Sequence, residues 1–254
     1  MILENNYSYL KHVVLKKDDI PSLSNYPFSL PIIQSLDSLS FHPKVTYIIG
    51  ENGTGKSTLL EAIAVAYGFN AEGGTKNFNF STYASHSTLH EYLKLIKSAY
   101  KPDDGFFLRA ESFYNVASYI DEMDKDKDNI CSSKIIDSYG GKSLHEQSHG
   151  ESFFSLFMNR FLGNGLYILD EPEAALSPMR QLSMLTRMHE LASENSQFII
   201  ATHSPILMAY PNSRIYYLEH DSMREVTLEE TEHYQTMKLF FDNKDRLFHH
   251  LFQS

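Results

Sequence analysis

The sequence predicts an α/β fold with a mostly parallel sheet. Three short apolar runs, "KVTYIIG", "GLYILD" and "SQFIIATH", are typical of buried strands. The stretches "STLLEAIAVAY" and "PMRQLSMLTRMHELASEN" carry apolar residues at helical spacing. Short strands that alternate with crossover helices form parallel sheets. The 254 residues contain no repeat and no long linker, so we expect a single domain.

Other segments complete the expected order of elements. "YSYLKHVVL" and "GFFLRAESF" read as strands, and "SNYPFSLPIIQSL" as a Pro-punctuated segment followed by a short helix. Residues 89–100 show a helical pattern of apolar residues, so a helix is expected there. The C-terminal stretch "HYQTMKLFFDNKDRLFHHLF" is also helical in pattern. Its apolar residues serve either the core or an interface between copies, and the core is favoured.

Composition narrows the class of protein. The formal net charge is −10, whereas proteins that attract phosphate backbones are usually basic over one face. Nucleic acid is therefore disfavoured as a partner, although a local basic patch stays open. Cys131 is the single cysteine, which excludes an internal disulfide and fits an inert thiol in a reducing cytoplasm. No apolar run approaches the roughly 20 residues that span a bilayer, and no secretory signal is present. We expect a cytoplasmic protein without membrane insertion.

The segment "GENGTGKST" matches the phosphate-binding pattern G-x-x-x-x-G-K-[ST] between an expected strand and an expected helix. Its glycines let backbone N–H groups surround a phosphate, and the helix N-terminus adds a partial positive charge. Lys56 can reach the β- and γ-phosphates, and Ser57 can ligate Mg²⁺. The chain is therefore expected to bind a nucleoside triphosphate. The predicted nucleotide-binding residues are Asn52, Gly53, Thr54, Gly55, Lys56, Ser57 and Thr58.

"LYILDEPEAALSP" supplies acids at the end of a strand. Asp170 is placed to hold Mg²⁺ through water, and Glu171 to accept a proton from the attacking water. Glu173 reads as an ordinary acidic residue in the first turn of the following helix. His203 ends the next strand, where a γ-phosphate should lie, so a phosphate contact is favoured over a polar cap to the sheet. Lys56, Glu171 and His203 are the expected catalytic group.

"SHGES" opens a third expected helix. Exposed N–H groups at a helix start attract anions, while Ser148 can equally well cap the helix. The residues alone leave these two interpretations equal.

Together, the phosphate loop, S-x-G-E at a helix start, the strand ending in two acids and the strand ending in His resemble the ABC-type ATPase family. The resemblance covers most of the chain and implies a P-loop NTPase head that binds ATP and Mg²⁺. In that family a signature sequence clamps the γ-phosphate bound by the opposite subunit. Ser148 then matches the signature serine, Gly150 its second glycine, and Glu151 stands in place of the glutamine. "AALSP" occupies the D-loop, so a homodimer formed on ATP binding is implied.

The chain departs from the family pattern in two places. His149 replaces the first signature glycine, and no glutamine lies between Asn52 and Glu146 to serve as the Q-loop residue. Glu111, with Arg109 nearby, is a weak substitute. The adenine-stacking aromatic residue is also undecided. Tyr26 or Phe28 could serve, and either could belong to the core.

The resemblance divides the single domain, 1–254, into a nucleotide-binding core at about 1–84 and 163–254 and a helical signature lobe at about 85–162. The drifted signature is more similar to the branch with DNA-repair and SMC heads, and most similar to small stand-alone bacterial ATPases. It implies ATP hydrolysis that drives or gates a separate effector, with phage defence or DNA as contexts. The alternatives are a slow-turnover nucleotide-gated binding switch and the ATPase subunit of a transporter.

Overall fold

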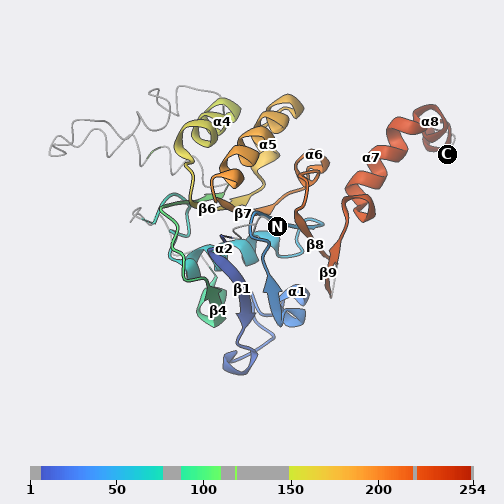
Figure 1. Ribbon diagram of the computed structural model, residues 1–254. Coiled ribbons are helices and arrows are strands. Elements are labelled where there is room, and N and C mark those ends of the chain that lie inside the picture. The colour runs from blue at the N-terminus through green and yellow to red at the C-terminus, as the bar shows by residue number, and fades with distance from the viewer. Residues whose placement is uncertain (1–6, 77–86, 110–117, 119–148, 220–221, 253–254) are drawn as a thin grey trace, which may run out of the picture.

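The fold is that of a computed structural model, which describes residues 7–76, 87–109, 118, 149–219 and 222–252. In this part of the chain a six-stranded sheet and a three-stranded sheet are layered with helices (Figure 1). The order in the large sheet is β5-β6-β7-β3-β8-β9. The first five of these strands are parallel, and β9 is antiparallel to β8. The expected α/β class with a mostly parallel sheet is confirmed.

In the large sheet the five parallel strands end at one edge, and the antiparallel strand β9 runs in the opposite direction. Their bounds are β3 Val45–Gly50, β5 Asp104–Arg109, β6 Gly165–Asp170, β7 Gln197–Ala201, β8 Arg214–Leu218 and β9 Met223–Val226. Asp170 pairs with Ala201 on one side and with Arg109 on the other, while Gly50 pairs with Leu218. Because parallel strands bring their carboxyl ends to one edge, the residues that follow β3, β6 and β7 meet there.

Each face of the large sheet packs against its own core. Tyr47 and Tyr167 lie on the face covered by α4 His149–Arg160, α5 Pro178–Ser193 and α6 Pro205–Met208. Ile48 and Ile168 lie on the opposite face, against α2 Lys56–Tyr67. Neighbouring residues of a strand thus serve different cores, as the two-residue period of a strand requires. Burial on both faces explains why these strands read as continuous apolar runs.

The small sheet has the order β2-β1-β4 and is antiparallel. Its strands and the adjoining turns and short helix are β1 Leu10–Leu15, η1 Lys17–Asp19, α1 Pro31–Ser35, β2 Ser38–Ser40, η2 Thr88–Tyr92 and β4 Leu93–Lys97. The helix expected over residues 89–100 is wrong, because η2 is a 3₁₀ turn and β4 is a strand. β4 buries Leu93 and leaves most of its other residues accessible, and it is held by its ladder to β1. An apolar pattern this short fits the period of a helix and the period of a strand equally well.

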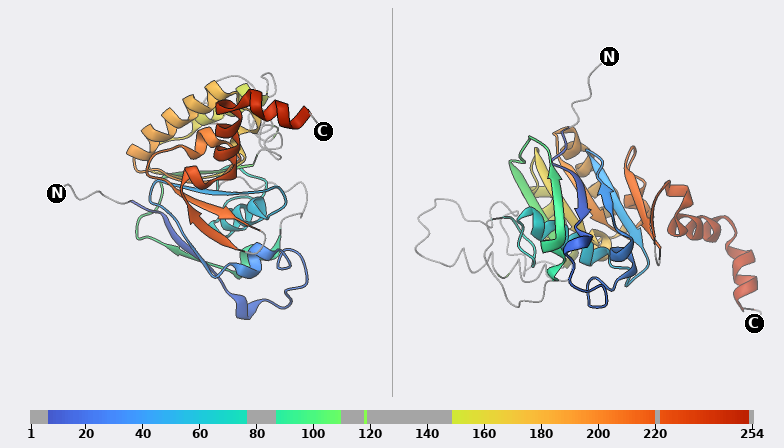
Figure 2. Two further views of the ribbon diagram at one scale, coloured as in Figure 1. Left: turned by 90° about the vertical axis from the view of Figure 1, so that its right-hand side faces the viewer. Right: turned by 90° about the horizontal axis from the view of Figure 1, so that it is seen from below.

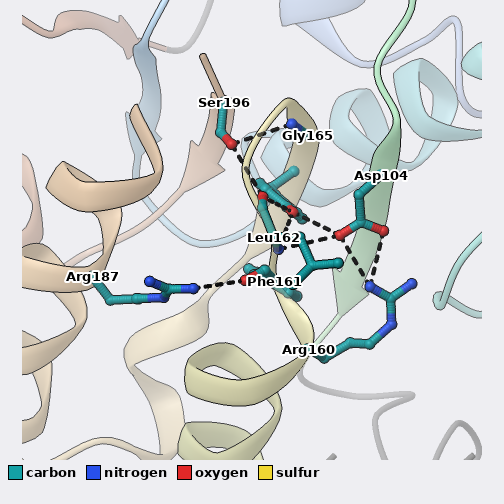
Figure 3. A network of polar contacts seen from close by, with 8 residues as sticks. Asp104, Arg160, Phe161, Leu162, Gly165, Arg187 and Ser196 are labelled. Carbon is teal, nitrogen blue, oxygen red and sulfur yellow. Dashed lines mark hydrogen bonds and ion pairs between the residues drawn. The ribbon is translucent and has the colours of Figure 1, made fainter. Parts of the chain in front are cut away.

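A polar network ties the end of α4 to the large sheet (Figure 3). Arg160 Nη1 donates to both carboxylate oxygens of Asp104, at 2.9 and 3.0 Å. The buried Tyr167 hydroxyl also reaches Asp104, at 2.7 Å, and contacts the backbone of Leu162. Burial raises the pKa of the Tyr167 hydroxyl, and the Asp104 carboxylate adds to the rise. The hydroxyl therefore stays protonated and donates, which fixes the C-terminal end of α4 on β5 and β6.

The C-terminal segment leaves the body of the molecule (Figures 1 and 2). After β9 come η6 Leu228–Glu230, α7 Glu232–Asp242 and α8 Lys244–Phe252. We call α7 and α8 the C-terminal arm. The expected helices are confirmed, but the expected core packing is wrong, since no residue of either helix is buried. Phe241 is 72% exposed and Phe252 75% exposed.

Candidate functional site

The phosphate loop joins β3 to α2 at the carboxyl edge of the sheet. Gly53 and Gly55 have φ of +81° and +99°, a region that other residues rarely adopt. Gly50 lies against β8, where an added Cβ would come within 2.6 Å of the Leu218 carbonyl oxygen. Thr54 closes the loop by donating its hydroxyl to the Glu51 carbonyl at 2.8 Å. The glycines that the motif requires are thus also required by the backbone.

Lys56 is buried at the start of α2, with 4% of its surface exposed. Its ammonium donates to the carbonyl oxygens of Gly50 and Glu51, at 2.9 and 2.8 Å. Burial lowers the pKa of Lys56, while the carboxylates of Glu171 and Asp170 act in the opposite direction. A buried cation is retained only where it has partners, and here they belong to the loop that would surround a phosphate. The loop therefore holds the charge in place for an anion.

Ser57 and Asp170 face each other across this edge. The Ser57 hydroxyl donates to Asp170 Oδ1 at 3.1 Å, and Asp170 is buried at the end of β6. One hydroxyl and one carboxylate are oxygen ligands that suit Mg²⁺, which keeps several waters and takes its remaining ligands from substrate phosphates. In the described part of the chain, no group of three or more His, Cys, Asp or Glu side chains forms a metal cage. The pair fits Mg²⁺ bound together with a nucleotide.

Glu171 directs its carboxylate to the same edge from a strained backbone. Its φ and ψ of 50° and 52° are left-handed, an uncommon conformation for a residue with a side chain. Its N–H donates to the Ala201 carbonyl at 2.9 Å, which anchors it to β7. Its Oε1 lies 3.5 Å from His203 Nε2, and both side chains are partly accessible. An acid and an imidazole thus face each other beside Lys56.

Glu173 has a role beyond that of an ordinary acid in the first turn of a helix. Its side chain accepts a hydrogen bond from the backbone N–H of His203. Burial raises the pKa of Glu173, and hydrogen bonds from the backbone act in the opposite direction. The residue stands in the first turn of η5 Pro172–Ala175, as the sequence indicates, but its carboxyl group points inward and supports the loop that carries His203.

Two pockets adjoin this edge. One, of about 450 Å³, is lined by phosphate-loop and α2 residues together with Tyr26, Leu30 and Glu171. Tyr26 is 65% exposed and its hydroxyl lies 3.1 Å from Thr58 Oγ1. Phe28 is 5% exposed and packs edge-on against Tyr92, so it belongs to the core. Of the two aromatic candidates, only Tyr26 lines the pocket.

The other pocket, of about 610 Å³, lies between the phosphate loop and α7. Its lining is Glu51, Asn52, His203, Pro205, Glu232, His233, Thr236 and Met237. Sequence reasoning missed the four residues that α7 contributes. No motif marks them, and nothing in their spacing indicates that this helix returns to the strand edge. His233 Nε2 lies 3.2 Å from His203 Nδ1.

The signature segment is described only from the start of α4. Gly150 packs so closely on the D-loop that an added Cβ would overlap the backbone carbonyl of Ala175. Glu151 lies 3.8 Å from Arg180, at the start of α5. Ser148 lies outside the described residues, as does Glu111. Arg109 is engaged with Glu61, at 2.6 Å.

The sheet, with the phosphate loop and the acids at this edge, has the fold of P-loop NTPases of the ABC type. An AAA domain model matches residues 31–149, and a second AAA domain model, whose description names an AbiEii toxin of a type IV TA system, matches residues 145–209. The chain is 26% identical to the energy-coupling factor transporter ATP-binding protein EcfA1 of Fusobacterium nucleatum, over 72% of each chain. It is also 26% identical to an ABC transporter ATP-binding protein of Caldanaerobacter subterraneus, over 69% of this chain and 77% of that protein.

The fold is also similar to that of cbiO1 from Clostridium perfringens, part of the ABC transporter complex cbiONQ. The TM-score is 0.50 and the identity 16%, over 96% of this chain and 99% of that one. The family matches and the ATP-binding relatives support an ABC/AAA-like ATPase, as the motifs indicated. None of the helices that the structure describes combines the length and apolar character needed to cross a membrane.

Proposed function

We propose that the chain binds ATP with Mg²⁺ and hydrolyses it between two copies, and that this cycle gates a separate effector. One observation carries the proposal. Lys56, the Ser57–Asp170 pair and the Glu171–His203 pair meet at the carboxyl edge of three parallel strands. A cation, a magnesium-ligand pair, an acid and an imidazole are the groups that phosphoryl transfer to water needs.

Each residue would have a distinct role. The loop N–H groups and Lys56 would hold the β- and γ-phosphates, and Ser57 with Asp170 would hold Mg²⁺, which neutralises phosphate charge when bound. Glu171 would orient a water and accept its proton. His203 would donate a hydrogen bond to the γ-phosphate. The gain in rate would come mainly from positioning and from stabilisation of charge.

A second copy would complete the site through Ser148 and Gly150. In support, the start of α4 and the D-loop are packed together at Gly150 and Ala175. The two segments that would face the other subunit therefore form one unit. Because the polar network around Asp104 holds the far end of α4 on the sheet, that unit would move with the sheet.

The effector is proposed to be a separate protein. The family model that names a toxin of a type IV TA system supports a defence-related context, whereas the two relatives described above carry the names of transporter ATP-binding proteins. The second candidate function is therefore an ATPase subunit that docks on a membrane partner. A slow nucleotide-gated switch and an ATP-dependent contact with DNA are further alternatives. Salt-sensitive duplex binding that requires ATP would support the DNA contact.

The test is the solution mass of Glu171→Gln with and without ATP–Mg²⁺. Glutamine keeps the size of the side chain but cannot accept the proton, so hydrolysis should stop while ATP stays bound. A shift from monomer to dimer on addition of ATP is expected. Lys56→Ala in the Glu171→Gln background is the control, because it removes the phosphate contact and should prevent the shift.

Three results would each contradict a part of the proposal. A monomer that binds ATP would reduce the signature segment to a helix cap and leave a simple nucleotide binder. A dimer of unchanged mass with and without ATP would assign the contact between copies to another surface, such as the C-terminal arm. Unaltered hydrolysis by Glu171→Gln would remove Glu171 from the catalytic group.

A further inference from the structure

The imidazoles of His203 and His233 form a pair at the joint between the sheet and the C-terminal arm. His203 follows β7, and His233 lies in the first turn of α7, which Thr231 caps by accepting from the Tyr234 N–H. His203 Nδ1 and His233 Nε2 are 3.2 Å apart, and the ring centroids are 5.3 Å apart. Burial lowers the pKa of both imidazoles, so both rings are neutral near pH 7.

A proton count fixes the direction of this hydrogen bond. Two neutral rings that face each other nitrogen to nitrogen share one proton between those atoms. The other nitrogen of His203, Nε2, is buried and lies 3.5 Å from the Glu171 carboxylate. A lone pair there would be repelled by that carboxylate and by a γ-phosphate. Nε2 must therefore carry the proton of His203, which leaves Nδ1 as an acceptor and makes His233 Nε2 the donor.

We propose that His233 is a positioning residue for hydrolysis, which holds His203 in the Nε2–H tautomer and aims that N–H at Glu171 and the γ-phosphate position. The inference rests on the proposed function, and it adds a residue that no motif marks. It also gives the C-terminal arm a physical link to the carboxyl edge of β3, β6 and β7, which we call the nucleotide edge. The link exists because the donor belongs to the first helix of that arm.

Three substitutions separate hydrogen bonding from packing. In His233→Gln the side-chain amide reaches the position of imidazole Nε2, so the donor to His203 is kept. In His233→Asn the amide falls short, near the position of Nδ1, and the donor is lost. In His233→Leu the volume is largely kept and every polar atom is lost. His250→Leu, an exposed histidine on α8, is the matched control.

The first measurement is steady-state ATP hydrolysis. We expect kcat of His233→Gln to stay within about threefold of the wild-type value. We expect kcat of His233→Asn and His233→Leu to fall about tenfold or more. KM for ATP should stay within about threefold, because the phosphate loop is not altered. A pure packing role would give the opposite order, with Leu active. Wild-type kcat in the Leu variant would overturn the proposal.

The second measurement is the tautomer of His203, read from imidazole ¹⁵N shifts by NMR without nucleotide. The expected signal is a protonated Nε2 in the wild-type and Gln proteins, and a mixture of tautomers in Asn and Leu. A protonated Nδ1 in the wild-type protein would overturn the inference whatever the activity. This readout needs no turnover, so it is distinguishable from the absence of any hydrolysis, which would contradict the proposed function itself. If Leu fails to fold, the comparison of Gln with Asn still decides.

Discussion

The helices that pack on the sheet beside the nucleotide edge and the helices of the C-terminal arm both carry large apolar side chains. Only the helices on the sheet bury them. α2 crosses over from β3, and eight of its twelve residues are buried between the two sheets. α7 and α8 follow the edge strand β9, and neither buries a residue. The helical pattern of the sequence is the same kind of signal in both places. What differs is whether a later strand brings the chain back onto the sheet.

Short helices that stand alone are marginal in water, so the arm depends on local contacts. Lys238 donates to Asp242 at 2.8 Å, one helical turn away, and Phe240 meets Phe248 across the junction of the two helices. Contacts of this kind contribute a few tenths of a kcal/mol each. The base of the arm is better held, because Thr231 is fully buried and His233 meets His203.

The largest difference between the two regions is expected when one phenylalanine in each is replaced by alanine. Phe157 on α4 is 1% exposed and packs against Phe161, whereas Phe241 on the arm is 72% exposed. Phe157→Ala should lower the free energy of unfolding by about 3–5 kcal/mol, and Phe241→Ala by less than about 0.5 kcal/mol. Urea unfolding followed by circular dichroism measures both. A comparable loss at Phe241 would mean that the arm is packed in solution, against the body or a second copy.

A second test compares one lysine from each region. Lys56→Ala removes the buried cation of the phosphate loop, and we expect ATP affinity to fall by about 100-fold, or about 2.7 kcal/mol. Lys238→Ala removes an exposed ion pair from the arm and should leave the affinity within about twofold. Calorimetric titration with ATP–Mg²⁺ gives both values. Equal affinity in Lys56→Ala and the wild-type protein would show that the nucleotide binds elsewhere.

Much of this contrast could be read from the sequence at the nucleotide edge. There the sequence shows glycines and a lysine at fixed spacing after one strand, and acids at the end of another. Because parallel strands bring their carboxyl ends together, these residues are expected to meet at one edge. The arm and the small sheet could not be read in this way. Leu93–Lys97 became a strand because β1 offers a ladder. In the large sheet, Arg214–Leu218 likewise lies beside β3, where Thr46 pairs with Arg214, 168 residues away in the sequence. Such pairings depend on distant partners.

The site shows the same division. Lys56, Ser57, Asp170 and His203 belong to motifs whose chemistry fixes their spacing, and they lie at the expected edge. His233 belongs to no motif, and it reaches the site only because the chain turns at β9 and Thr231 starts a helix there. The inward orientation of Glu173 was not predictable either, since the backbone N–H that donates to it belongs to a loop 30 residues away.

A third, smaller difference is expected for polar contacts. Tyr167→Phe removes a buried hydroxyl that holds Asp104 and Leu162, and it should cost about 1–3 kcal/mol of unfolding free energy. In the arm, Asp242→Asn weakens the exposed ion pair with Lys238 and should lower the free energy of unfolding by less than about 0.5 kcal/mol. Urea unfolding of each variant beside the wild-type protein measures both losses. Tyr167→Phe should leave ATP affinity unchanged, since the network lies at the other end of β6. If affinity falls instead, the anchor of α4 is coupled to the loop.

The smallest effect concerns the joint between the two regions. Burial lowers the pKa of His203 and of His233; Lys56 adds to the lowering in both, Glu171 opposes it for His203 and Glu232 for His233. In the unfolded chain both imidazoles take up protons near pH 6.5, while in the folded chain they stay neutral to lower pH. The unfolded state then binds more protons, so the free energy of unfolding falls as the pH drops through 6.5.

Glu173 acts in the opposite sense, because its raised pKa lets the folded state hold a proton above the ordinary value of 4.5. The contribution of Glu173 to the slope is the same in the wild-type protein and in His233→Gln, so it cancels in the difference between them. His233→Gln keeps Glu173 and removes one of the two imidazoles. Between about pH 7.5 and 5.5 the wild-type protein should lose more unfolding free energy than His233→Gln, and urea titrations at several pH values measure this. Equal slopes would mean that the imidazole of His233 is as accessible to protons in the folded chain as in the unfolded one, and that the arm does not cover it.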